Sequence, residues 1–359
     1  NDDNPRINDI KSRTVTLPNG DQREVTWYQF RIPIADSPVR SAIGGITDIR
    51  SIRFARLYLK EFNQNTVLRF GSLDLVRSDW RRFTQDLNED APDSPNAEFN
   101  VAIIGIQEND GNYVIPPGVR REELNNNNNI VRQNEQSLVL EVCELQPEDS
   151  RGVFKNINVD MRQYKRLRMF LHAEAEPGQS LDEGELVAFL RMGNDFTDNY
   201  YQIEVPLLPT DLVDTGVPIE ERVWPAENEL NIPLEILQQI KSRGISDQTL
   251  INEDATFYDV IDGQLSENPV PEFPSSIVGN QRVGIKGNPN FGNIRVLMVG
   301  VKNSGSASRN ACGEVWFNEL RMSDLDNEGG WAAILSMDSN IADFADFSAT
   351  GRRSTIGFG

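Results

Sequence analysis

The alternation of apolar and polar residues along the chain predicts a protein built mainly of β-strands. Residues 294–301 form a nearly unbroken apolar run rich in β-branched side chains, as expected of a strand that is buried on both faces. Several further segments show period-two alternation and are separated by turn residues such as Gly, Pro and Asp. These segments are residues 137–145, 165–173, 185–192 and 199–207. Together they predict a β-sandwich.

The last strand of this sandwich is expected at residues 314–322, where strict alternation assigns every side chain to a face. Alternation places Arg321 on the same face as Val315 and Phe317. The opposite face then carries the remaining large side chains, namely Trp316, Leu320 and Met322. We expect this strand and the preceding apolar strand to close the sandwich.

A similar pair of segments occurs near the start of the chain, at residues 52–59 and 67–79. Both pairs open with Ile-Arg and end with acidic, Leu and Ser-Asp positions in the same order. A repeat at this distance is too long for a solenoid and indicates two domains of one type in tandem. Because the first copy lacks its front strands and the chain does not begin with Met, we expect the chain to be cut from a larger protein.

These patterns divide the chain into four parts. We assign residues 1–85 to the C-terminal part of a first β-sandwich domain, and residues 86–134 to a linker and the strands that enter the second domain. Residues 135–328 are the second β-sandwich domain, with an insertion at residues 209–280. Residues 329–359 combine small residues, loose alternation and an aromatic-glycine ending, and we expect them to start the strands of an outer-membrane β-barrel. The expected fold is all-β, with tandem jelly-roll-like sandwiches.

One short helix is predicted inside the insertion, at residues 232–242. Asn231 is suited to cap this helix, and Gly244 lies just past its expected end. The apolar stripe of the helix comprises Ile236, Leu237 and Ile240. Because insertions of this length are usually functional or disordered, we interpret the insertion as a partner-contacting or gating element. The alternative is a surface loop without a role.

The charge of the chain narrows the classes of partner. Lys and Arg number 35 against 55 Asp and Glu, which gives a formal net charge of −20 at pH 7. Binding to a phosphate backbone requires clustered Lys and Arg, so nucleic acid is not an expected partner. No apolar run approaches the roughly 18–20 residues that a membrane-spanning helix needs.

The two cysteines, Cys143 and Cys312, lie in expected strands near the start and the end of the second sandwich. The first and last strands of such folds commonly lie side by side, so a structural disulfide is one interpretation. The other interpretation, which we favour, is two separate buried cysteines that act as small apolar side chains. Two distant cysteines and one histidine do not supply the four ligands of a structural zinc site.

No catalytic, cofactor-binding or metal site is predicted. His172 is the only histidine, and the arginines on its face of the strand predict a half-exposed position with a structural role. Because this single histidine is assigned a structural role, most catalytic mechanisms that pair a nucleophile with a histidine base are disfavoured. Residues 324–328 place oxygen-bearing side chains at alternate positions but lack the distal Glu of a calcium loop. Neither a phosphate-binding loop nor a dinucleotide fingerprint occurs.

Several motifs resemble one known family. The C-terminal segment reads VWFNELRMSDLDNEGGWAA, with ACGE before it and IADFADFSATG after it. Further matches are IRFARLYL, LRFGSLDLVRSDWRRF, YVIPPGVRRE, SLVLEVCEL, RGVFK and YKRLRMFLHAE. In this order they cover most of the chain. They resemble the SprA family, also called Sov, which comprises the outer-membrane translocons of the type IX secretion system in Bacteroidetes.

The resemblance implies a non-enzymatic role without cofactors. Members of the family form a very large single-chain β-barrel that passes folded cargo proteins across the outer membrane, and they support gliding motility. The implied location is the outer membrane or the cell surface. The implied partners are other subunits of the secretion machinery and exported cargo proteins. Within such a channel these domains would cap the pore, line its lumen or offer a docking face.

A carbohydrate-binding module is the alternative function. The segment VWFNELRM also resembles the last strand of galactose-binding-like jelly rolls, and the chain carries five tryptophans that suit sugar stacking. The two functions make different structural predictions. A sugar-binding module should show exposed aromatic side chains clustered on one face or rim of a sandwich.

Overall fold

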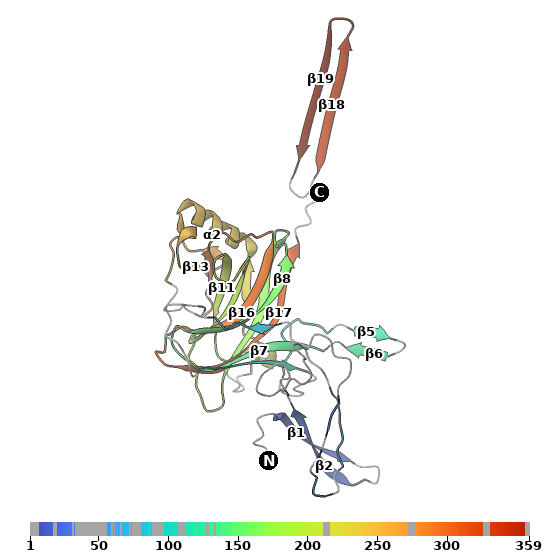
Figure 1. Ribbon diagram of the computed structural model, residues 1–359, viewed down its shortest axis with the longest axis vertical. Coiled ribbons are helices and arrows are strands. Elements are labelled where there is room, and N and C mark those ends of the chain that lie inside the picture. Colours follow the sequence, from blue (N-terminus) through green and yellow to red (C-terminus); the bar gives the residue numbers. More distant parts are fainter. Residues whose placement is uncertain are drawn as a thin grey trace, which may run out of the picture. The chain divides into compact units, whose positions relative to one another are not determined.

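The computed structural model describes most of the chain and divides it into two compact units, Asn1–Leu75 and Val76–Gly359 (Figure 1). The described residues are 7–16, 20–30, 32, 56–58, 60, 62–64, 67–71, 73, 80–85, 87, 97–106, 113–121, 123–126, 129–132, 134–210, 216–271, 278–325 and 331–355. Each unit is considered by itself.

In the first unit, β1 (Ile7–Thr16) and β2 (Gln22–Phe30) form an antiparallel hairpin. The described residues of the two predicted strands nearby, 56–58, 67–71 and 73, lie outside any strand. The other residues of those two predicted strands lie outside the described part of the chain. The assignment of residues 1–85 to the end of a first sandwich therefore stays a prediction.

The second unit contains two antiparallel sheets. The smaller sheet has five strands in the order β12-β9-β17-β7-β4. Their bounds are β12 (Leu230–Pro233), β9 (Tyr164–Ala175), β17 (Ala311–Leu325), β7 (Gln136–Leu145) and β4 (Glu98–Gly105). The larger sheet has eight strands in the order β14-β13-β15-β11-β10-β16-β8-β3. Their bounds are β14 (Gln264–Leu265), β13 (Thr256–Ile261), β15 (Gln281–Lys286), β11 (Tyr200–Pro206), β10 (Leu186–Gly193), β16 (Ile294–Asn303), β8 (Ser150–Val159) and β3 (Arg81–Arg82).

One apolar core joins the two sheets. It takes Leu140 from β7, Leu171 from β9 and Val315 from β17, and packs them with Leu190 from β10 and Val299 from β16. The prediction of a mainly β protein with a sandwich is confirmed, because the alternating segments supply the strands on both sides of this core. The predicted buried strand is β16, which lies between β10 and β8 and is buried along nearly its whole length.

The predicted faces of β17 are wrong in its second half because the strand carries a β-bulge. The register with β9 shifts between Asn318 and Arg321, and Glu319 adopts a left-handed backbone with φ 50°. The extra residue reverses the alternation beyond it. Leu320 and Met322 therefore pack against the same core as Val315 and Phe317. Arg321 lies on the opposite face, and strict period-two counting has no means of showing this.

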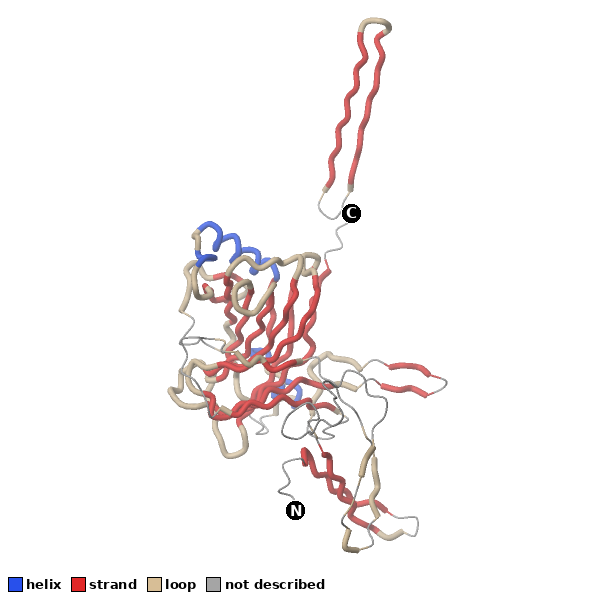
Figure 2. Tube along the Cα trace, viewed as in Figure 1, coloured by secondary structure: helices blue, strands red, loops and turns tan. Residues whose placement is uncertain are grey.

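The insertion at residues 209–280 is built into the sandwich. Its strand β12 extends the five-stranded sheet beside β9, and β13 extends the eight-stranded sheet beside β15. Its other elements are α1 (Ile219–Val223), η1 (Ala226–Asn228), α2 (Leu234–Ser246) and η2 (Thr249–Ile251). Figure 2 shows α2 as the longest helical segment beside the strands.

The predicted helix is confirmed with corrected ends. It begins at Leu234 because the residues before it pair with β9 as a strand, so Pro233 takes the cap position expected for Asn231. Gly244 lies inside its last turn. The predicted apolar stripe is buried in the core, and α2 packs against both β9 and β15. Among the described residues, no helix has the length and apolar character needed to cross a membrane.

Two further hairpins complete the described elements. Strands β5 (Glu123–Asn126) and β6 (Asn129–Arg132) form a short antiparallel pair. Strands β18 (Ala332–Ile341) and β19 (Ala345–Ser354) form a ten-residue ladder. All side chains of this second hairpin are exposed.

Candidate interaction face

The outer face of the five-stranded sheet, turned away from the shared core, gathers the chemically distinctive side chains of the chain. Strand register places them in rows across β4, β7, β17 and β9. One row is Asn100, Glu141, Glu314 and Glu174, and the next is Ala102, Val139, Trp316 and His172. Farther along, Asn318 lies opposite Phe170 and Arg321 opposite Arg168. Residues directly opposite on one face are within contact distance, so each row is a set of neighbours.

The carboxyl row holds a coupled acid pair. Burial raises the pKa of Glu314 to about 8, and its hydrogen bond with Glu174 acts in the same direction. Interaction with His172 lowers the pKa of Glu174, since the imidazole Nε2 lies 3.4 Å from its carboxylate. The indole nitrogen of Trp316 donates a hydrogen bond of 2.7 Å to Glu314. At neutral pH the two carboxyl groups therefore share one proton, because two adjacent charges in this half-buried row repel each other.

His172 is buried, contrary to the half-exposed position expected from the arginines on its strand. Its side chain is 1% exposed because the insertion crosses this face. The imidazole Nδ1 lies 2.8 Å from the carbonyl oxygen of Val223 and 2.9 Å from the hydroxyl of Thr210, and its ring lies 4.0 Å from that of Trp316. Its hydrogen-bonded, packed position agrees with the expected structural role.

The tryptophans nearest to this histidine do not form a sugar platform. Trp224 and Trp316 are 3% and 4% exposed and pack edge to face at 6.0 Å. Trp224 also donates from its indole nitrogen to the carbonyl of Val114, which holds the segment around residues 113–119 over the sheet. Sugar stacking requires an open aromatic face. This pair is closed, so it gives no support to the carbohydrate-binding alternative.

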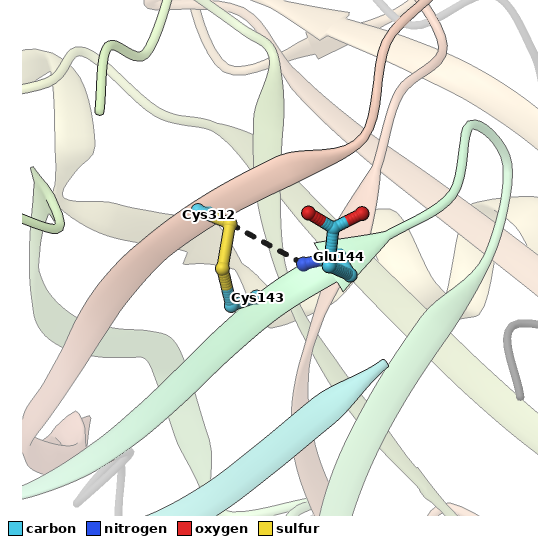
Figure 3. Close-up of side chains that lie close together, drawn as sticks. All are labelled: Cys143, Glu144 and Cys312. Carbon is cyan, nitrogen blue, oxygen red and sulfur yellow. Dashed lines mark hydrogen bonds between the residues drawn. A yellow bond between two sulfur atoms is a disulfide. The ribbon is translucent and has the colours of Figure 1, made fainter. Parts of the chain in front are cut away.

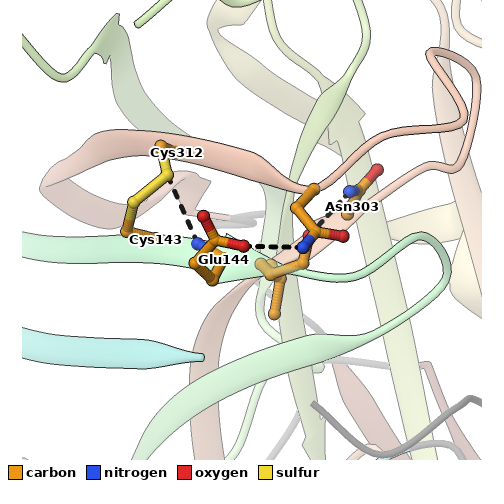
Figure 4. The surroundings of a disulfide bond; sticks show 6 residues. Cys143, Glu144, Asn303 and Cys312 are labelled. Atoms are coloured by element: carbon orange, nitrogen blue, oxygen red, sulfur yellow. Dashed lines mark hydrogen bonds between the residues drawn. A yellow bond between two sulfur atoms is a disulfide. The ribbon is translucent and has the colours of Figure 1, made fainter. Parts of the chain in front are cut away.

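The structure joins Cys143 of β7 to Cys312 of β17 by a disulfide next to the carboxyl row (Figure 3). The backbone nitrogen of Glu144 donates to the sulfur of Cys312 over 3.3 Å. Asn303 lies close to the disulfide (Figure 4). Its side chain donates to the carbonyls of Leu145 and Arg309, which fixes the turns that flank the two strands. The bond links neighbouring strands, as in the first of the two interpretations of the cysteines. With both sulfurs used in it, the grouping of Cys143, Glu144 and Cys312 offers no thiolate to a metal.

Arginines occupy the opposite end of the face. Arg168 donates to Glu229 over 2.7 Å, and Arg166 donates to the side-chain oxygen of Asn231 over 2.7 Å. The guanidinium of Arg321 lies 5.1 Å from the ring centre of Phe170. At about 3.4 Å per residue, the six strand steps from Glu314 to Arg321, not counting the residue looped out at the bulge, span about 20 Å. The face therefore runs from an acidic end to a basic end, with the buried aromatic row between them.

A second buried charge cluster lies on the eight-stranded sheet. Glu204 is fully buried, and its carboxylate lies 2.7 Å from the ammonium of Lys302 and 3.6 Å from the guanidinium of Arg282. Asp259 pairs with Arg282 at 3.4 Å. These charges neutralise one another within the sheet, which is the usual condition for burying them. Sequence patterns do not reveal either cluster, because the partners are far apart in the chain.

The calcium-like segment noted in the sequence lies mostly outside the described part of the chain. Of the calcium-like segment at residues 324–328, Asp324 is exposed in a left-handed backbone conformation, and residues 326–328 lie outside the described residues.

Comparison with known proteins identifies one family. A family model described as motility related/secretion protein, SprA_N, matches residues 3–359. No curated protein matches the chain.

Proposed function

The chain belongs to the SprA_N family of motility-related and secretion proteins, and from this membership we propose that it is a non-enzymatic part of an outer-membrane translocation channel of the type IX secretion system. Membership supports a location in the cell envelope or at the cell surface, and contact with secretion machinery. Our proposal goes beyond family membership in three points: the protein forms part of a channel, its partners include exported cargo proteins, and it lies in the outer membrane.

The observation that carries the proposal is the two-faced hairpin β18–β19. Opposite residues share a face, so its register divides the side chains into two sets. The mainly apolar face carries Leu335, Met337, Ile341, Ala345, Phe347 and Ala349, and its polar members are Ser339 and Arg353. The other face is mostly polar and carries Ser336, Asp338, Asn340, Asp346, Ser348, Thr350 and Arg352, with Ile334 as its one large apolar member. Strands of ten residues with apolar and polar side chains on alternate faces match those of outer-membrane barrels.

Exposure of the apolar face supports the same role. Leu335 is 77% exposed, and Met337, Ile341 and Phe347 are each at least half exposed. A soluble hairpin rarely leaves so many large apolar side chains on one face in water. In a barrel this face would meet lipid, while the polar face would meet the lumen. We propose that the sandwich serves this channel as a cap, a lumen domain or a docking domain.

The test places one arginine on each face of the hairpin in the full-length native protein. Met337→Arg puts a charge on the proposed lipid face, whereas Ser336→Arg puts the same charge at nearly the same depth on the polar face. An arginine facing lipid near the midplane costs about 2–4 kcal/mol. We expect Met337→Arg to reduce the amount of folded protein in the outer membrane and the export of cargo, and Ser336→Arg to preserve both.

Equal effects of the two arginines would contradict a lipid-facing role for this face. Normal outer-membrane assembly of a protein that lacks residues 332–354 would contradict a barrel role for the whole hairpin. Both results are read by fractionation of membranes and by the amount of cargo in the culture medium.

A further inference from the structure

A cavity of about 400 Å³ opens at the basic end of the interaction face, beside the bulge of β17. Its polar lining comprises Arg120, Arg121, Arg321, Asn134, Glu135 and Glu319. Three arginines in one cavity are notable in a chain with a net charge of −20. Three arginines and two glutamates leave a formal charge of +1 on this lining.

The bulge holds Arg321 in this cavity. Without the extra residue at Glu319, Arg321 would fall on the core side of the sheet with Val315 and Phe317. The left-handed backbone of Glu319 is unfavourable for a residue with a side chain, and such positions cluster at binding sites. Bulges of this kind are over-represented next to functional sites, where they redirect a side chain.

The guanidinium of Arg321 is held in place, but its positive charge is only weakly neutralised. It lies over the ring of Phe170, and within the described part of the chain its ion pair is with Glu319 at 3.9 Å. Its side chain is 36% exposed. The neighbouring Arg168 is different, because Glu229 neutralises it at 2.7 Å. A planar guanidinium fixed on an aromatic ring has its N–H groups arranged for a bidentate oxyanion.

The two glutamates of the lining select the type of anion. Glu135 is held in place, since its carboxylate accepts hydrogen bonds from Asn318 over 2.9 Å and from Tyr113 over 3.4 Å. A phosphate dianion would exceed the +1 charge of the lining and meet two carboxylates, of which Glu135 is held in place. A single carboxylate matches that charge, and Asn134 adds a polar side chain at the wall. The volume is that of a small ligand pocket, large enough for an amino-acid residue.

From this geometry we propose that the cavity binds one carboxylate of a partner polypeptide, with Arg321 as its main anchor and Arg120 and Arg121 beside it. The carboxylate comes from an acidic side chain or from a chain terminus. This docking site does not depend on the barrel role of the hairpin. The cavity is formed by described residues of the sandwich and of the covering segment, which is the stretch that lies over the sheet and includes Arg120 and Arg121.

The test measures binding of fluorescent peptides to the 359-residue chain by fluorescence anisotropy at low salt. Three peptides of one neutral sequence are compared: one with a central Glu and an amidated end, one with Gln and an amidated end, and one with Gln and a free carboxyl end. We expect the Glu peptide or the free-end peptide to bind, and the Gln amide not to bind. The carboxylate that binds identifies the source.

Arg321→Gln should weaken this binding by about tenfold or more, because one charge-assisted bidentate contact is lost. Arg120→Gln, on an exposed residue of the covering segment, should weaken it as well without affecting folding. The matched control is Arg295→Gln, which removes an exposed arginine of β16 and the same charge. We expect the control to bind within about twofold of the unmodified chain.

Three results would overturn the proposal. The first is equal binding of the Gln amide and the carboxylate peptides, and the second is no binding of either carboxylate peptide at millimolar concentration. The third is competition by inorganic phosphate that is stronger than competition by acetate, which would assign the cavity to phosphate instead. Circular dichroism of each variant confirms that the fold is retained.

Discussion

At the residue scale, Glu314 is the side chain most altered by its surroundings. Burial and the neighbouring Glu174 raise its pKa from 4.5 to about 8, so the folded chain binds a proton that the unfolded chain releases at neutral pH. Stability from this proton is fully present below about pH 4.5 and is lost as the pH rises through about 8. Glu141 lies opposite Glu314 in the same row, and His172 contacts Glu174 from the next row.

The first prediction is therefore a pH-dependent loss of stability that Glu314→Gln removes. Between about pH 4.5 and 8 the melting temperature of the unmodified chain should fall, relative to that of Glu314→Gln, by roughly 2–4 °C for each 1 kcal/mol lost. Thermal unfolding by circular dichroism measures both. The control is Glu253→Gln, an exposed glutamate, which should follow the unmodified chain. Parallel curves for the unmodified chain and Glu314→Gln would rule out the shared proton.

The second prediction concerns the disulfide between Cys143 and Cys312, which are 169 positions apart in the chain. Replacing both cysteines by Ala should lower the free energy of unfolding by roughly 2–4 kcal/mol, because the unfolded chain then loses a long-range constraint. Urea unfolding measures the loss. A reductant should destabilise the unmodified chain and leave the double variant unchanged. Two titratable thiols in the unfolded, unreduced chain would show that the bond does not form.

At the element scale, the bulge of β17 decides which side chains reach the outer face. Apolar side chains on both sides of it, Val315 and Phe317 before and Leu320 and Met322 after, stay on the core side only because one residue is looped out. The same bulge brings Arg321 to the cavity. Counting with a fixed period of two does not allow for an extra residue. The faces predicted for Leu320, Arg321 and Met322 are therefore wrong.

The third prediction tests this bulge through its left-handed residue. Glu319→Gly should be neutral or stabilising, since Gly adopts φ 50° without a steric penalty. Glu319→Val should destabilise the chain by about 1–2 kcal/mol, because a β-branched residue is strained in that conformation. Urea unfolding compares the two variants. A more stable Val than Gly variant would mean that residue 319 is an ordinary strand residue in solution.

At the scale of the whole molecule, the insertion is part of the sandwich. Its strands extend both sheets, and α2 packs against β9 of one sheet and β15 of the other. The segment around Trp224 also covers the aromatic row of the outer face. If the insertion gated a channel by moving as a unit, β12 would have to separate from β9 and β13 from β15. A partner contact through its exposed residues does not require this.

The fourth prediction is that the insertion unfolds together with the sandwich. Leu237→Ala, at a fully buried position of α2, should lower the free energy of unfolding by about 2–5 kcal/mol in a single transition. The matched control, Gln238→Ala, changes an exposed neighbour and should stay within about 0.5 kcal/mol. Tryptophan fluorescence and far-ultraviolet circular dichroism should follow the same curve. An earlier, separate transition in Leu237→Ala would show that the insertion folds independently.

The sequence by itself determined the main strands of the second sandwich, the apolar stripe of α2 and the family, because these are written in local alternation and in contiguous motifs. It placed Cys143 and Cys312 in strands near the two ends of the sandwich, but left their pairing open. Only the tertiary structure decided the burial of His172, the proton shared by Glu174 and Glu314, and the face of Arg321. Each of these depends on strand register, on a single looped-out residue or on a distant segment folding over the sheet. None of those determinants is local in the chain, so no pattern in a window of residues carries them.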